Sequence, residues 1–121
     1  MNITLNKKEQ EFVTAYFEAM HWTEECDDEL CEDFKREQII ECLAFYVAVE
    51  CYLSDDNRAQ AGHDFWLSRN GHGTGFWDRE SDGCYKPQVA DLLQRKCEWF
   101  GMVDVIFENG GPYYNYGVTT A

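Results

Sequence analysis

The chain has few basic residues, few prolines and no long apolar run. Ten lysines and arginines stand against 23 aspartates and glutamates, which gives a formal net charge of −13. Such a charge repels phosphate backbones and anionic lipid surfaces, so direct binding to nucleic acid or to a membrane is disfavoured. No stretch reaches the roughly 20 apolar residues of a membrane span, and residues 1–12 lack the basic and apolar regions of a signal peptide. We therefore expect a cytoplasmic protein.

Cysteine pairs with metal-binding spacing are also missing. The six cysteines include no CxxC pair, and Cys26 and Cys31, the closest two, have no histidine beside them. A structural zinc site is not predicted, and neither is any other metal or a cofactor. Without an export signal the thiols are expected to be reduced. Cys42 and Cys51 are expected to pack as small core residues.

The apolar content is sufficient for one domain. Of the 121 residues, 45% are hydrophobic and 16% are aromatic. This composition argues against disorder and predicts a single compact domain over residues 1–121, monomeric or weakly dimeric. We expect the core to contain the four tryptophans, Trp22, Trp66, Trp77 and Trp99.

Hydrophobic periodicity predicts helices in the first half of the chain. Asn6 and Glu9 have the spacing of a capping box at the start of a helix over residues 6–20. Residues 35–53 are apolar around much of a helical circumference, which predicts the most buried helix. In the segment 24–33, seven of ten residues are acidic and none is basic, which predicts a solvated surface. The residues of this acidic surface are Glu24, Glu25, Asp27, Asp28, Glu29, Glu32 and Asp33.

The second half of the chain predicts extended segments. Short aromatic runs at 64–69 and 76–79 flank a loop, 70–75, that contains three glycines. We expect these runs to be two paired strands, with a positive φ at one or more of the glycines. Pro87 begins a further predicted helix, which ends before Gly101.

Residues 102–107 and 112–116, joined across a glycine-rich turn, predict a β-hairpin at the end of the chain. The predicted fold class is therefore α+β. In this prediction N-terminal helices pack on a small antiparallel sheet made of two hairpin-like units, with one helix between them.

The densest group of chemistry-bearing residues lies in the segment 62–79, which reads GHDFWLSRNGHGTGFWDR. This segment resembles GHDFWLTRNGHGxGFWDR, a motif of a family of small proteins encoded by bacteriophages and prophages. Ser68 stands where the family usually has threonine. The resemblance implies a phage gene product that works in the cytoplasm of an infected bacterium, and it implies no catalytic residues.

Three roles fit the residues of this motif. A buried network of Asp, Arg and His side chains would hold the glycine loop in place. A glycine loop flanked by aromatic residues would instead bind a ligand or a partner. In the third role, His63 and His72 would be the acid/base or metal groups of a small hydrolytic enzyme. The candidate binding residues are His63, Asp64, Trp66, Arg69, Asn70, His72, Trp77, Asp78 and Arg79.

Size, acidity and the lack of a catalytic signature favour a non-enzymatic accessory protein over the hydrolytic enzyme. Such a protein would bind a host or defence protein with a basic surface and modulate its activity. DNA mimicry is one mode of binding, in which the carboxylates of 24–33, with Glu37, Glu41 and Glu50, take the place of phosphates.

Overall fold

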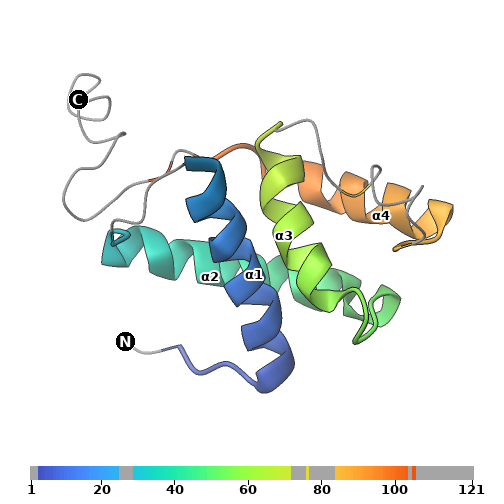
Figure 1. The fold of residues 1–121 in the computed structure, drawn as a ribbon, viewed down its shortest axis with the longest axis horizontal. Helices are drawn as coiled ribbons and strands as arrows, with labels where there is room; N and C mark the ends of the chain where they lie inside the picture. Colours follow the sequence, from blue (N-terminus) through green and yellow to red (C-terminus); the bar gives the residue numbers. More distant parts are fainter. Residues whose placement is uncertain (1–2, 25–28, 72–75, 77–83, 104, 106–121) are drawn as a thin grey trace.

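The computed structural model describes residues 3–24, 29–71, 76, 84–103 and 105. These residues form four α-helices and one short 3-10 helix, η1. The elements are α1 (Lys7–Glu24), α2 (Glu32–Val49), η1 (Glu50–Tyr52), α3 (Arg58–Arg69) and α4 (Pro87–Glu98). Helices α1 and α3 lie side by side and run in the same direction, and α2 crosses behind them (Figure 1). Helix α4 packs against α3 and α2.

The predicted α+β fold is wrong, because the described residues contain no strand. Residues 64–69, predicted as a strand, form the second half of α3. Buried positions lie around most of α3, and they include Arg58, Gly62, Asp64 and Arg69. The apolar residues of this segment alone therefore show no clear helical period.

The other predicted strands fall mostly outside the described residues. Phe76 is a turn residue, and Met102, Val103 and Val105 have no regular secondary structure. The rest of 76–79, of 102–107 and the whole of 112–116 lie outside the part of the chain that the structure describes.

The starts of α1 and α4 and the end of α4 agree with the sequence signals, whereas α1 continues to Glu24 rather than ending at residue 20, and α2 spans Glu32–Val49 rather than 35–53. The Glu9 N–H donates to Asn6 Oδ1 and the Asn6 N–H donates to Glu9 Oε1, both at 2.8 Å, so the predicted capping box is confirmed. Helix α4 begins at Pro87, and Gly101, with φ at +69°, follows its last turn. A left-handed glycine is a common way to end a helix.

Helices α1 and α3 are in close contact through small residues. A Cβ atom added at Gly62 would lie 2.2 Å from the carbonyl oxygen of Phe12 and 3.3 Å from Ala15 Cβ. Only glycine leaves room for two backbones to approach this closely. Gly62 therefore determines how near α3 lies to α1.

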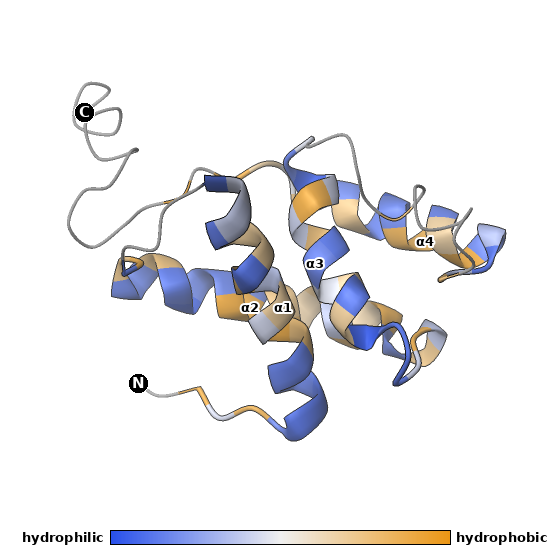
Figure 2. Ribbon diagram, viewed as in Figure 1, coloured by the Kyte–Doolittle hydropathy of each residue, from blue (hydrophilic) through white to orange (hydrophobic). Residues whose placement is uncertain are grey.

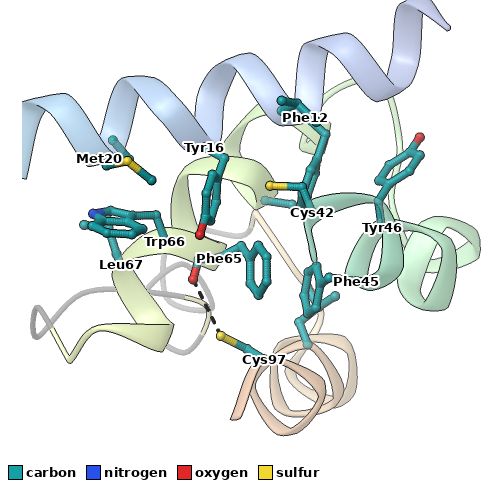
Figure 3. Packing of buried hydrophobic residues seen from close by; sticks show 14 of the residues in the cluster. Phe12, Tyr16, Met20, Cys42, Phe45, Tyr46, Phe65, Trp66, Leu67 and Cys97 are labelled. Atoms are coloured by element: carbon teal, nitrogen blue, oxygen red, sulfur yellow. Dashed lines mark hydrogen bonds between the residues drawn. The ribbon is translucent and has the colours of Figure 1, made fainter. Parts of the chain in front are cut away.

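The core between the helices is aromatic (Figure 3). The Phe65 ring is stacked on Phe45, with ring centroids 4.1 Å apart and planes 6° apart, and it lies 5.2 Å from the Tyr16 ring. The Cys97 thiol of α4 contacts the Phe65 carbonyl oxygen at 3.6 Å. Phe65 thus joins all four helices.

Several residues expected in the core lie elsewhere. Trp66 is buried as predicted, but Trp22 and Trp99 are 69% and 83% exposed, and Trp77 lies outside the described residues. Cys42 is buried as predicted, whereas Cys51 is exposed. In the part of the chain that the structure describes, the thiols of Cys31, Cys42, Cys51 and Cys97 are not in disulfides.

Helix α2 is not the most buried helix, contrary to the prediction from its composition, because a larger share of α3 is buried. One side of it is buried, but Ile40 and Val47 are 52% and 69% exposed. Helix α4 shows the more usual pattern, with Ala90, Leu93 and Cys97 buried and separate hydrophilic and apolar sides (Figure 2).

Candidate functional site

Half of the phage-like motif lies on α3, at the centre of the fold. Residues 62–69 belong to the helix, Asn70 is its C-cap, and Gly71 has φ at +66°, which confirms the positive φ predicted for the glycine loop. Phe76 is buried, and its N–H donates to Ser68 Oγ at 3.2 Å. The candidate residues His72, Trp77, Asp78 and Arg79 lie outside the described part of the chain.

Arg69, the last residue of α3, connects four parts of the chain. Its guanidinium donates to the Tyr16 hydroxyl at 3.1 Å and to the Glu41 carboxylate at 2.7 Å. It also donates to the carbonyl oxygens of Phe100 and Gly101 at 2.8 and 2.7 Å. The Arg69 side chain is 1% exposed, so its charge is neutralised by Glu41 within the protein rather than by solvent.

The Tyr16 hydroxyl extends this network into α2. It accepts from Arg69 and donates to Gln38 Oε1, and Gln38 is itself buried. Burial raises the pKa of Tyr16 well above its ordinary value, which keeps the hydroxyl protonated as the donor this bond requires. Side chains from α1, α2 and α3 are therefore joined by one chain of hydrogen bonds.

Asp64 makes different contacts from Arg69. Its carboxylate accepts from Gln60 Nε2 at 2.8 Å and from the Tyr85 hydroxyl at 3.0 Å. Burial, together with the neighbouring Asp64 carboxylate, raises the pKa of Tyr85 far above its ordinary value. Asp64 thus holds Tyr85, two residues before α4, against α3.

Trp66 and Asn70 also bond within the fold. The indole Nε1 of Trp66 donates to Thr23 Oγ1 at 2.8 Å, which joins the end of α3 to the end of α1. Asn70 Nδ2 donates to the Trp66 carbonyl oxygen at 3.0 Å, and Asn70 Oδ1 accepts from the Val103 N–H at 2.9 Å. The segment after α4 is thereby held against the end of α3.

His63 and Asp64 lie on different sides of α3. The His63 ring is 6.1 Å from the Trp22 ring of α1, while Asp64 bonds to Tyr85 before α4. His63 Nδ1 is buried without a hydrogen-bond partner. The pairing of imidazole and carboxylate that acid/base catalysis requires is therefore not formed by these two neighbours.

The structure describes four of the seven residues of the predicted acidic surface. Glu29, Glu32 and Asp33 are exposed at the start of α2, and Glu24 is partly buried at the end of α1. Glu25, Asp27 and Asp28 lie outside the described residues. Glu41, considered as a phosphate mimic, is instead paired with Arg69.

Sequence reasoning missed a groove between α1 and the N-terminal half of α2, which meet at the crossing seen in Figure 1. Its volume is about 860 Å³. Its apolar lining consists of Leu5, Val13, Phe17, Trp22, Leu30 and Ile39. The sequence contained one signal for this groove, a second apolar stripe on α1. Val13 and Phe17 are four residues apart and lie beside Phe12 and Tyr16, which face the core.

Neither a metal centre nor a membrane helix is present in the part of the chain that the structure describes. No three His, Cys, Asp or Glu side chains there are close enough to hold a metal ion. None of its helices is both long and apolar enough to cross a bilayer.

Comparisons of the chain with models of protein families, with curated proteins and with solved structures gave no significant match.

Proposed function

We propose that this protein is a small acidic accessory protein, made by a phage or prophage in the bacterial cytoplasm, that binds and modulates a host or defence protein with a basic surface. The cellular setting rests on the resemblance of residues 62–79 to the phage family. The binding role rests on charge and on the geometry of the ionic groups.

The observation that carries the proposal is the unequal burial of the two signs of charge. Arg58 and Arg69 are 7% and 5% exposed, and both are paired with carboxylates, Arg58 with the exposed Glu11 and Asp55 and Arg69 with Glu41. Among the acidic residues that the structure describes, Asp64 alone is buried. The surface therefore has fewer free positive charges than the composition alone suggests. The negative electrostatic field of the protein attracts a basic partner and accelerates its association.

The exposed carboxylates at the start of α2 are the proposed contact region. Glu29, Glu32, Asp33 and Glu37 are exposed there, and Asp33 is paired with Arg36 at 3.3 Å. Mimicry of DNA phosphates is a narrower form of the proposal, in which this region occupies a nucleic-acid-binding surface of the partner. Both forms predict binding that weakens as salt rises, because exposed charges are screened within about 8 to 10 Å at ordinary ionic strength.

The test is affinity capture from phage-infected cells with three forms of the protein. These are the wild type, the variant Glu32→Gln/Glu37→Gln, and the control Asp56→Asn/Glu98→Gln, which removes two exposed carboxylates elsewhere. We expect the wild type and the control to retain the same basic partner, and Glu32→Gln/Glu37→Gln to lose it. Equal capture by all three forms, or capture that does not change with salt, would contradict the proposal.

A further inference from the structure

Helix α1 has two apolar sides, and only one of them is covered by α3. Phe12 and Tyr16 are fully buried on the α3 side. Val13 and Phe17, each one residue further along, line the groove beside α2. The groove wall on α1 follows the same helical period as the core side, since it includes Gln10, Val13, Thr14, Phe17, Glu18, His21 and Trp22.

The groove has the dimensions of a helix-binding site. Its wall on α1 runs from Gln10 to Trp22, a length of about 18 Å at 1.5 Å per residue, or slightly more than three helical turns. The buried floor is formed by Val13 and Leu30, each 5% exposed. At one end, Trp22 stands at the rim with 69% of its surface exposed. An exposed tryptophan beside an apolar floor is a common anchor for a protein partner.

The charges at the rim determine which helix would fit. Glu18 and Glu29 line the groove and are exposed, with Lys35 as the lysine among the lining residues. Glu32 and Asp33 are exposed on the adjoining first turn of α2. The rim is therefore net negative, in a protein whose net charge is −13.

We infer that the groove between α1 and α2 docks an amphipathic helix of the partner, with apolar residues on one face and lysine or arginine on its flanks. This inference rests on the proposed function and names the segment of the partner that the acidic protein recognises. The apolar face of the partner helix enters the groove between Phe17 and Ile39 and covers Trp22. Its basic flanks meet Glu18 and Glu29. This is the helix-in-groove mode of recognition, in which apolar anchors supply affinity and flanking charges supply selectivity.

The test uses a synthetic helical peptide of leucine and lysine, about 14 residues long, with its leucines on one face. Its affinity for the full chain is measured by fluorescence polarisation, beside a peptide in which glutamate replaces lysine. We expect the lysine peptide to bind and the glutamate peptide not to bind. Trp22→Ala should weaken binding of the lysine peptide by about tenfold, because a tryptophan that the partner covers contributes more than most interface residues.

The chain offers matched controls for each part of the groove. Trp99→Ala removes another exposed tryptophan that lies outside it, at the end of α4. Ile39→Ser changes a groove residue, and Ile40→Ser changes its exposed neighbour on α2. We expect affinity to fall for Trp22→Ala and Ile39→Ser and to stay at the wild-type value for the two controls. The circular dichroism spectrum of each variant shows that it is folded.

The remaining outcomes separate this inference from the proposed function. Equal loss in groove variants and controls, or no binding of the lysine peptide, contradicts the groove inference. A change in the sedimentation of the free protein on Trp22→Ala would assign the groove to a second copy of the chain and also contradicts it. If partner capture from infected cells still depends on Glu32 and Glu37, the proposed function stands without the groove; if that dependence is absent, the proposed function fails regardless of the peptide result.

Discussion

The two sides of α1 show how one helix serves two purposes. On the α3 side, Gly62 brings the backbones into contact, and hydrogen bonds from Trp66 and Arg69 reach α1 at Thr23 and Tyr16. On the α2 side, an apolar groove of about 860 Å³ remains open. The closed side combines backbone contact at Gly62 with fully buried aromatic residues and interhelical hydrogen bonds, whereas the open side has partly exposed apolar residues with acidic neighbours.

This difference changes the interpretation of the motif. A dense group of Arg, His, Asp and Trp resembles a binding site in the sequence, but Asp64, Trp66 and Arg69 are buried and bonded to other parts of the fold. Buried polar groups need such partners, because leaving one unpaired costs about 1 to 3 kcal/mol. Asp64, Trp66 and Arg69 therefore stabilise the fold, and we propose the open side as the surface for a partner.

The closed side should be most sensitive at Arg69. Replacing it by methionine leaves Glu41 without its counter-ion. It also removes the hydrogen bonds that Arg69 donates to the Tyr16 hydroxyl and to the two carbonyl oxygens after α4. We expect Arg69→Met to lower the free energy of unfolding by about 4 kcal/mol, because several hydrogen bonds of a buried guanidinium are lost together, measured by urea denaturation. Arg36→Met, at an exposed pair with Asp33, should cost less than about 0.5 kcal/mol. A loss below about 1 kcal/mol at Arg69 would show that the network is not required.

The close approach of α1 and α3 should be the next most sensitive feature. Gly62→Ala places a methyl group 2.2 Å from the Phe12 carbonyl oxygen, and we expect a loss of about 3 kcal/mol from overpacking. Gly71→Ala is the matched change, because there the added atom meets open space but φ is +66°. Its cost should be about 1 kcal/mol, from backbone strain alone. Equal losses at the two glycines would mean that the helices separate without penalty.

High pH should destabilise the fold through the buried Cys97 thiol, which joins α4 to α3 at the Phe65 carbonyl oxygen. Burial raises the pKa of Cys97 from the ordinary 9.0 to about 12. The unfolded chain loses this proton near pH 9 while the folded chain keeps it, so stability is full below pH 9 and decreases between pH 9 and 12, by about 1.4 kcal/mol per pH unit for one such group. Urea denaturation across this range should give a smaller slope for Cys97→Ala and an unchanged slope for the exposed Cys51→Ala. An unchanged slope in Cys97→Ala would contradict the assignment of this pH dependence to the Cys97 thiol.

The open side should tolerate the loss of its largest exposed residue. Trp22 is 69% exposed, so Trp22→Ala should change the free energy of unfolding by no more than about 0.5 kcal/mol. The check is thermal and urea denaturation beside Trp99→Ala. A loss of 2 kcal/mol or more would place Trp22 in the structural core rather than at a binding surface.

The sequence predicted local features of the fold better than the packing of its helices. Capping by Asn6 and Glu9, the start at Pro87 and the positive φ of Gly71 all follow from the chemistry of nearby residues, and all are confirmed. The fold class was wrong because aromatic residues in 64–69 have high strand propensity. Tertiary contacts override that propensity, since Phe65 packs on Tyr16 of α1 and Phe45 of α2, and Trp66 bonds to Thr23 of α1.

The candidate site was predictable only in part. Exposed carboxylates at Glu29, Glu32 and Asp33 follow from their density in the sequence. The partners of Arg69 come from α1, α2 and the segment after α4, so spacing along the chain could not identify them. The groove likewise depends on the angle at which α2 crosses α1, a property of the packed helices.

The central claim is that residues 62–70 stabilise the fold while partner binding occurs on the other side of α1. Trp66→Phe tests it most directly, because it removes the hydrogen bond to Thr23 and leaves a smaller ring at a buried position. The measurement is the unfolding free energy of this variant together with its affinity for the leucine–lysine peptide. We predict a stability loss of about 2 kcal/mol, from the lost hydrogen bond and the cavity, with wild-type affinity. Wild-type stability with weakened binding would contradict the claim and make Trp66 part of the binding site.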